Sequence, residues 1–221
     1  KKNKKTIWLY LFPAVLMVVI ILYLPIFINL YESFFSWGAM STRHEFVGFE
    51  NYIKMFQDDI FYIAMKNNLI FTVMSVICQI GISLLIANVL ETKFIRRTAV
   101  FFRTVYFIPS LLMVTVVGIA FQMIYSPSIG IVNPLLEMLG IDTTNIDLLG
   151  NAGSATYAIA GMSQWQYIGY TVILFVVAIQ NIPSDLYEAA EIDGAGAVKK
   201  FIYITLPELK DTIIINTIIT V

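Results

Sequence analysis

The placement of charged residues constrains this chain more than any other feature. Four stretches contain no Asp, Glu, Lys or Arg, and each exceeds the ~20 apolar residues that a helix needs to cross the hydrocarbon core of a bilayer. They lie between Lys5 and Glu32, Lys66 and Glu91, Arg103 and Glu137, and Asp147 and Asp185. Lipid offers the backbone no hydrogen-bond partner, so these runs are expected to be helical.

The charge-free stretches predict four spanning helices near residues 7–30, 66–90, 101–125 and 153–181, and a fifth that begins near Thr212. The chain is 58% hydrophobic and 13% charged, whereas soluble domains average ~45–50% and ~25%. We therefore predict an all-α, polytopic transmembrane helical bundle that forms a single domain over residues 1–221. The sequence begins without Met and stops inside an apolar run, so we expect a longer natural protein with one or more further C-terminal spans.

Basic residues indicate the orientation, because Lys and Arg concentrate in cytoplasmic connections. Three segments carry most of them, namely Lys1, Lys2, Lys4 and Lys5, then Lys93, Arg96, Arg97 and Arg103, then Lys199, Lys200 and Lys210. The other side receives only Arg43, Lys54 and Lys66. We predict that the N-terminus, the second connection and residues 182–211 are cytoplasmic, and that residues 31–65 and 126–152 face outside.

Several function classes are disfavoured by the sequence. An ionisable residue inside a span usually marks a proton or ion pathway, and none falls at the centre of a predicted span. No glycine is followed directly by lysine, as a phosphate-binding loop requires. His44 and Cys78 are the only residues of their types, so neither a metal cluster nor a disulfide is expected. The net charge of −1 gives no sign of nucleic-acid binding. We expect no catalytic site and no cofactor.

Neutral polar residues do occur in the spans, and the run Gln164, Trp165 and Gln166 is the densest. Such side chains commonly hydrogen-bond between helices. The alternative is a pathway for a hydroxyl-rich solute, because amides and an aromatic face together suit sugars. Adjacent helical residues point about 100° apart, so Gln164 and Gln166 cannot both face one cavity squarely. Both interpretations stay open.

Residues 181–209, NIPSDLYEAAEIDGAGAVKKFIYITLPEL, predict a compact protrusion. Ser184 or Asp185 can cap a first helix, and Gly194 permits a sharp exit because glycine accepts positive φ. A second short helix is expected from about Val198 to Tyr203, and Pro207 is expected to stop it. The predicted helix–Gly–helix shape suits docking into another protein.

This segment resembles the EAA loop of ABC importer permeases, and its fuller form LYEAAEIDGA followed by ITLP resembles the carbohydrate branch. LFPAVLMVVIILYLPIFINLYESF, FVGFENYIKMF, FFRTVYFIP and SPSIGIVNPLLEMLGI are similar to earlier parts of the same family, in the same order. The pattern resembles the first permease of the maltose or glycerol-3-phosphate type. The chain has no room for the extra periplasmic domain and N-terminal helices of the enterobacterial maltose subunit, so it resembles the shorter members.

The resemblance implies a multi-pass subunit of the prokaryotic plasma (inner) membrane that imports a sugar or polyol. Its implied partners are a second related permease, a cytoplasmic ABC ATPase dimer that hydrolyses the ATP, and an extracytoplasmic solute-binding protein. Residues 182–209 would be the loop that couples the permease to the ATPase. The residues implied in ATPase docking are Glu188, Ala189, Ala190, Asp193, Gly194, Ile204, Leu206 and Pro207.

Two other functions remain open from the sequence. One is a permease of the same superfamily for a non-sugar solute. The other is a non-transporting membrane receptor or scaffold whose loop docks a cytosolic regulator, and ATP hydrolysis by the docking partner would separate it from a transporter.

Overall fold

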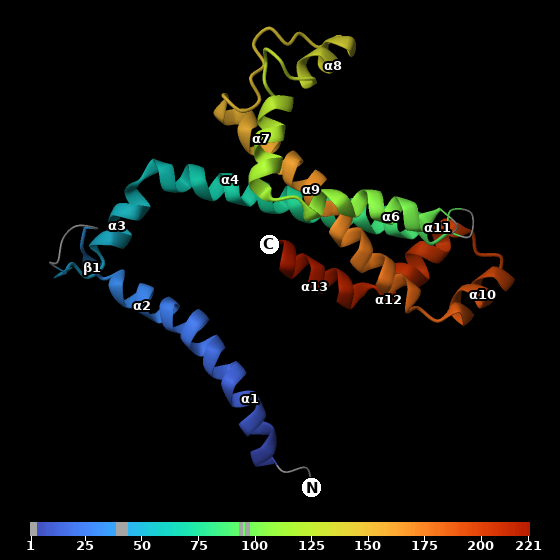
Figure 1. Cartoon of the computed structure of the whole chain (residues 1–221), viewed down its shortest axis with the longest axis horizontal. Helices are drawn as coiled ribbons and strands as arrows, with labels where there is room; N and C mark the ends of the chain where they lie inside the picture. Colours follow the sequence, from blue (N-terminus) through green and yellow to red (C-terminus); the bar gives the residue numbers. More distant parts are fainter. Residues whose placement is uncertain (1–3, 39–43, 93–94, 96–97) are drawn as a thin grey trace. The chain divides into compact units, whose positions relative to one another are not determined.

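The computed structural model describes residues 4–38, 44–92, 95 and 98–221, and the fold is almost entirely helical (Figure 1). Contacts divide it into two compact units, which meet in sequence at Met65 and Lys66. Some of the residues used to predict the orientation lie outside the described part of the chain, namely Lys1, Lys2, Arg43, Lys93, Arg96 and Arg97.

The first unit begins with one long helix. It consists of α1 (Lys4–Val18), a π-helical turn η1 (Val19–Tyr23) and α2 (Leu24–Glu32). Its stretch Ile7–Glu32 is long and apolar enough to cross a membrane. The wider π turn ends two residues before Pro25, which lacks the N–H that a regular helix would use there.

A small hairpin and a short helix follow the first span. Strands β1 (Phe35–Ser36) and β2 (Glu45–Phe46) are antiparallel, with Phe35 opposite Phe46. Helix α3 (Glu50–Gln57) is tied to the hairpin because the Asn51 amide donates to the carbonyls of Ser33 and Phe35, at 2.9 and 3.0 Å.

Helix α4 (Asp59–Ser75) begins the second long run, which continues through the π-helical η2 (Val76–Ile82) into α5 (Ser83–Leu90). This run is a candidate span of 32 residues. It starts earlier than the predicted residue 66 because Asp59 and Lys66 fall within the helix.

The third predicted span is not the continuous helix expected over residues 101–125. Helix α6 (Ala99–Phe107) passes into the 3-10 segment η3 (Ile108–Leu111), and α7 (Val114–Ile124) then leaves at a bend of 96°. The break follows Pro109, whose ring removes a donor, and Leu112 and Met113 are extended. Helix α8 (Val132–Met138) lies in the connection that follows.

Helix α9 (Ala152–Gln180) is the structural spine of the second unit. It is a 29-residue candidate span and contacts α5, η2, α6, η3, α7 and α13 (Figure 1). The hydrophobic core lies along it, where Val172, Phe175 and Val176 are buried with Ala87 and Leu90 of α5. At Gly169 the helices approach so closely that an added Cβ would lie 1.7 Å from the carbonyl oxygen of Tyr106 on α6.

Short helical segments and one further helix follow α9 over residues 184–220. Helix α10 (Ser184–Ile192) is followed by α11 (Ala197–Lys200), the π-helical η4 (Phe201–Thr205), α12 (Leu206–Glu208) and α13 (Lys210–Thr220). The predicted cap of the first loop helix differs, because its N-cap is Pro183 without a side-chain hydrogen bond.

The predicted stop at Pro207 also differs. Pro207 lies in the first turn of α12, where its missing N–H costs no helical hydrogen bond, and helical structure resumes at Lys210.

Candidate functional site

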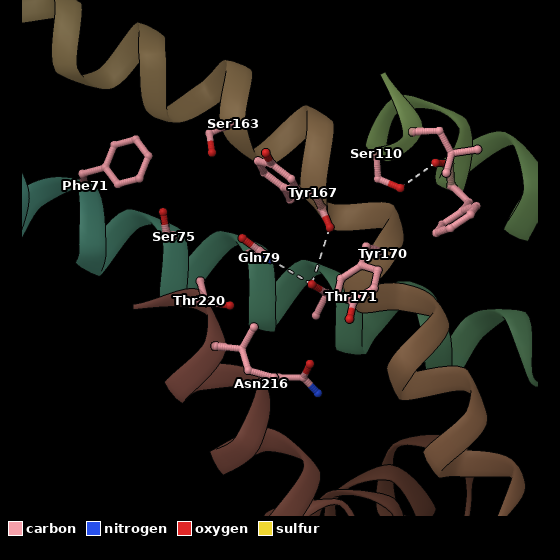
Figure 2. A pocket seen from close by; sticks show the side chains of 13 residues that line it. Phe71, Ser75, Gln79, Ser110, Ser163, Tyr167, Tyr170, Thr171, Asn216 and Thr220 are labelled. Carbon is pink, nitrogen blue, oxygen red and sulfur yellow. Dashed lines mark hydrogen bonds between the residues drawn. The ribbon is translucent and has the colours of Figure 1, made fainter. Parts of the chain in front are cut away.

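The second unit contains a cavity of about 550 Å³ that opens between its helices (Figure 2). Its walls come from α4, η2, the end of α6 with η3, α9 and α13. The polar lining residues are Ser75, Gln79, Ser110, Ser163, Tyr167, Tyr170, Thr171, Asn216 and Thr220, and the apolar ones are Phe71, Phe107, Leu111 and Ile219. Among the described residues that line it, none carries a charge.

Helical spacing explains why α9 supplies so much of this lining. Ser163, Tyr167, Tyr170 and Thr171 lie at i, i+4, i+7 and i+8, which places them on one face of the helix. Figure 2 shows this face turned toward Ser75 and Gln79 of the second long run. A polar stripe of α9 thus faces the cavity, while buried residues elsewhere on the helix pack against other helices.

Hydrogen bonds between and within helices hold the polar walls in place. The Gln79 amide donates to the Thr171 hydroxyl at 2.9 Å, which joins η2 to α9 (Figure 2). The Asn216 amide donates to the Thr212 carbonyl within α13 at 2.9 Å. Fixed amide and hydroxyl groups beside the rings of Tyr167 and Tyr170 can bind a neutral solute that both donates and accepts hydrogen bonds and offers an apolar face.

The three residues predicted for a solute pathway are not among those that line this cavity. The Gln164 amide donates to the Ser75 hydroxyl at 3.0 Å, and the Gln166 amide donates to the Leu112 carbonyl at 3.0 Å. Trp165 contacts the Phe121 ring, with 5.3 Å between centroids. The two glutamines thus reach different helices, in accordance with the ~200° between them on α9.

The cytoplasmic-loop candidate, residues 182–209, is built around one glycine. Gly194 has φ of 75°. The amide of Ala195 donates to the Ala190 carbonyl at 2.8 Å, and the amide of Gly194 donates to the Glu191 carbonyl at 3.1 Å. These two bonds form a Schellman motif, which ends α10 and satisfies its last carbonyls. The chain can then turn back into α11.

Contacts within the loop and one residue of the hydrophobic core hold the base of this loop. The hydroxyls of Tyr187 on α10 and Thr205 on η4 lie 2.9 Å apart, and Thr205 is buried. Lys200 forms an ion pair with Glu191 at 2.9 Å. Leu209, at the end of the loop, is 1% exposed in the hydrophobic core. The loop is therefore held at its base while α10 extends away from the core.

Most residues predicted to dock an ATPase are accessible. Glu188, Ala189, Asp193, Gly194, Leu206 and Pro207 are exposed, and Ala190 and Ile204 are half-buried. Apolar side chains also project from the loop, because Ile192 is 87% exposed and Val198 is 70% exposed. The combination of an acidic residue, small residues and exposed apolar side chains can form a protein–protein contact.

Sequence reasoning missed two features of the second unit. It missed Tyr170 and Asn216 as cavity residues, although the spacing of Ser163, Tyr167 and Tyr170 on one helical face was a usable signal. It also assigned Arg103 to a connection, whereas Arg103 lies within α6 and pairs with Glu91, to which the Gln180 amide donates at 3.1 Å. The contacts among α5, α6 and α9 bring Glu91, Arg103 and Gln180 together.

The segment between α7 and α9 is ordered by side chain to backbone bonds. The Asn133 amide donates to the Ile146 carbonyl at 3.1 Å, and Asp147 accepts from the Gly150 amide at 2.8 Å. Hydrogen bonds from the Thr144 hydroxyl and amide hold the pKa of Asp142 below its ordinary value. This segment therefore presents a preformed surface with acidic groups.

Comparisons with known proteins agree with this architecture. Residues 79–221 match the family described as binding-protein-dependent transport system inner membrane component. The chain is 40% identical over 219 residues to the probable ABC transporter permease protein YurN of Bacillus subtilis, covering 99% of the chain and 75% of that protein. It is 31% identical to the arabinooligosaccharides transport system permease protein AraP of Halalkalibacterium halodurans, covering 95% and 65%.

A solved structure has the same fold. A chain of a bacterial ABC transporter involved in the import of the acidic polysaccharide alginate matches with a TM-score of 0.79 and 25% identity, over 99% of this chain and 73% of that one. The family match spans more than half of the sequence, and the fold agrees over nearly all of it. The chain therefore belongs to the binding-protein-dependent transport system inner membrane component family, as a permease subunit of the ABC transporter type.

Proposed function

We propose that this permease lines part of the pathway of an ATP-driven importer for a sugar or polyol, through the cavity bordered by α9. The observation that supports this proposal most directly is the lining of that cavity. It combines fixed amides and hydroxyls with tyrosine rings and has no charge among its described residues. This chemistry suits a neutral, hydroxyl-rich solute. The relative AraP is named for arabinooligosaccharide transport, which supports the same class of cargo.

Energy for transport is supplied by a partner in this proposal. A cytoplasmic ABC ATPase dimer hydrolyses ATP and receives residues 182–209 in a cleft, with Glu188 and the small residues Ala189 and Ala190 at the contact. Gly194 provides the turn. The exposure of these residues and the buried anchors Thr205 and Leu209 support this role, because a movement of α10 would be passed to the core of the second unit.

A second related permease completes the pathway, and a solute-binding protein delivers the cargo from outside. Residues 31–65 and 126–152 would receive it. Support comes from the preformed acidic segment before α9 and from the alginate transporter, whose structure is also known in complex with an alginate pentasaccharide-bound periplasmic protein. The distribution of Lys and Arg favours a cytoplasmic N-terminus.

The proposal is tested first by isolating the full-length protein from its native membrane in mild detergent and identifying partners by mass spectrometry. Recovery of an ATPase and a second permease is expected. Recovery of the chain alone under several detergents would contradict the importer assignment. Reconstituted complexes are then supplied with the binding protein and a panel of labelled oligosaccharides, amino acids and peptides, and uptake of a sugar or polyol alone is expected.

A further inference from the structure

The third span contains a break that leaves part of its backbone without helical hydrogen bonds. Leu112 and Met113 are extended between η3 and α7, and the two arms meet at 96°. Inside a membrane protein every such carbonyl requires a partner from the protein, because the hydrocarbon offers none. The geometry of the break therefore depends on which group satisfies it.

Gln166 of α9 supplies a partner. Its side-chain amide donates to the Leu112 carbonyl at 3.0 Å, and the residue is 2% exposed. A hydrogen bond from a buried side chain meets less competition from water, so it fixes distance and direction more strictly than a bond between two exposed groups does. The contact thus joins α9 to the corner between η3 and α7, where the third span changes direction.

The same helix holds both arms of the bend. On the α7 arm, the Tyr125 hydroxyl donates to the Ala158 carbonyl at 3.1 Å, and Phe121 packs against Trp165. On the α6 arm, Gly169 of α9 allows the Tyr106 backbone to approach closely. Gln166 lies along α9 between these contacts. Loss of its amide would free the corner while leaving both arms attached.

The arm formed by α6 and η3 ends at the cavity. Phe107, Ser110 and Leu111 line it, and the Ser110 hydroxyl donates to the Phe107 carbonyl at 2.7 Å (Figure 2). Leu112 directly follows this wall. A shift of the corner would therefore move the wall relative to Tyr167 and Tyr170 on α9.

We propose that Gln166 is a positioning residue for transport, which sets the bend of the third span and thereby the Phe107–Leu111 wall of the cavity without contacting the solute. This inference rests on the proposed role of the cavity as the solute pathway. It gives Gln166 a different role from direct solute binding, the alternative that the sequence left open.

The bend is tested by distance measurement in the complete reconstituted transporter. Cys78 is the only cysteine of this chain, so Cys78→Ser gives a background in which Phe101→Cys on α6 and Ile119→Cys on α7 carry spin labels, with reactive cysteines of the partner subunits also replaced. Both positions are exposed in this chain. We expect one narrow distance distribution without further change and a broadened or shifted one with Gln166→Leu. The control Gln122→Leu removes the same amide from an exposed position on α7 and should leave the distribution unchanged.

Transport kinetics separate positioning from packing. Gln166→Leu should lower solute uptake per ATP hydrolysed while ATPase binding is retained. Gln166→Glu keeps the side-chain length, and the protonated form of its carboxyl can donate to the Leu112 carbonyl, whereas the ionised form cannot. Uptake by Gln166→Glu should approach that of the unchanged protein at low pH and decline as the pH rises and the carboxyl ionises, whereas Gln166→Leu should stay low at every pH.

The outcomes distinguish failure of the positioning role from failure of the proposed solute pathway. An unchanged distance distribution with Gln166→Leu, or equal uptake by Gln166→Leu and Gln166→Glu at every pH, would overturn the positioning role. A changed distribution with normal uptake would also overturn it as a role in transport. Failure of the proposed pathway would appear separately, as normal uptake when Tyr170 or Asn216 in the cavity is replaced. If Gln166→Leu does not accumulate, Gln166→Glu alone still tests the pH dependence.

Discussion

The cavity and the loop of residues 182–209 are built in different ways. The loop takes its shape from neighbouring residues, since Gly194 and the two bonds of the Schellman motif lie within six positions of one another. The cavity takes its shape from residues far apart in sequence, as in the bonds from Gln79 to Thr171 and from Gln164 to Ser75. A local motif can be recognised in a sequence, whereas a cavity between helices needs their rotation and contacts.

This difference predicts that the most damaging substitutions alter helix contacts rather than the loop. Gly169→Val should have the largest effect, because any Cβ would overlap the Tyr106 carbonyl and separate α6 from α9. Overpacking of this kind costs ~1–3 kcal/mol or more. The amount of folded complex and its thermal stability measure the effect.

Gly161→Ala on the same helix is the matched control. Its added Cβ would lie 3.5 Å from the Tyr125 hydroxyl, which is ordinary contact. Equal stability of the two variants would show that the close α6–α9 approach is not a requirement and would weaken the contrast between cavity and loop.

Gly194→Asp should have the next largest effect and a different character. A side chain at φ of 75° costs roughly 1–2 kcal/mol, which corresponds to a reduction of roughly 5- to 30-fold in the competent turn. We expect normal membrane insertion with loss of ATPase binding or of ATPase stimulation by solute. Co-purification and ATPase assays measure both.

Gly196→Ala serves as the control for the loop. Gly196 has φ of −70°, and nothing lies within 4 Å of an added Cβ. Normal coupling in Gly194→Asp would contradict the assignment of residues 182–209 as the coupling element.

Tyr170→Ala should act on solute handling and leave the loop unaffected. Tyr170 lines the cavity, and losing about 1.4 kcal/mol of binding corresponds to a tenfold rise in apparent KM. Solute uptake and ATPase co-purification are measured together. Tyr157→Ala on the same helix is the control, since Tyr157 is exposed and is not among the cavity residues. Equal uptake by both variants would place the pathway elsewhere.

Lys200→Met should have the smallest effect. Its ion pair with Glu191 is partly exposed, with side-chain exposures of 21% and 45%, and such pairs contribute ~0.2–1 kcal/mol. Thermal stability and ATPase binding should change little. The effect of the substitution should be smaller still at high salt, which screens the ion pair in the unchanged protein. A loss of coupling comparable to that of Gly194→Asp would show that the loop depends on tertiary ion pairing more than on its local backbone.

Particular residues show how far the sequence could be interpreted. The long helices followed from stretches without charge, and the turn at Gly194 followed from the freedom of glycine at positive φ. The bend after Leu111 did not follow, although Pro109 suggested a kink. A proline predicts a lost donor but not the 96° angle, and the hydrogen bond from Gln166 to the Leu112 carbonyl joins helices that are distant in sequence. The pairing of Arg103 with Glu91 was missed for the same reason.

The sequence by itself determined that this chain enters a membrane as helices and exposes a glycine-turned loop, because both results depend on local composition and backbone freedom. Only the tertiary structure decided which polar residues face the cavity, where the third span bends and which close approach holds α6 to α9. Those features depend on the rotation of each helix about its axis and on contacts between residues distant in sequence. Buried hydrogen bonds such as that from Gln164 to Ser75 exist only when both helices are in place.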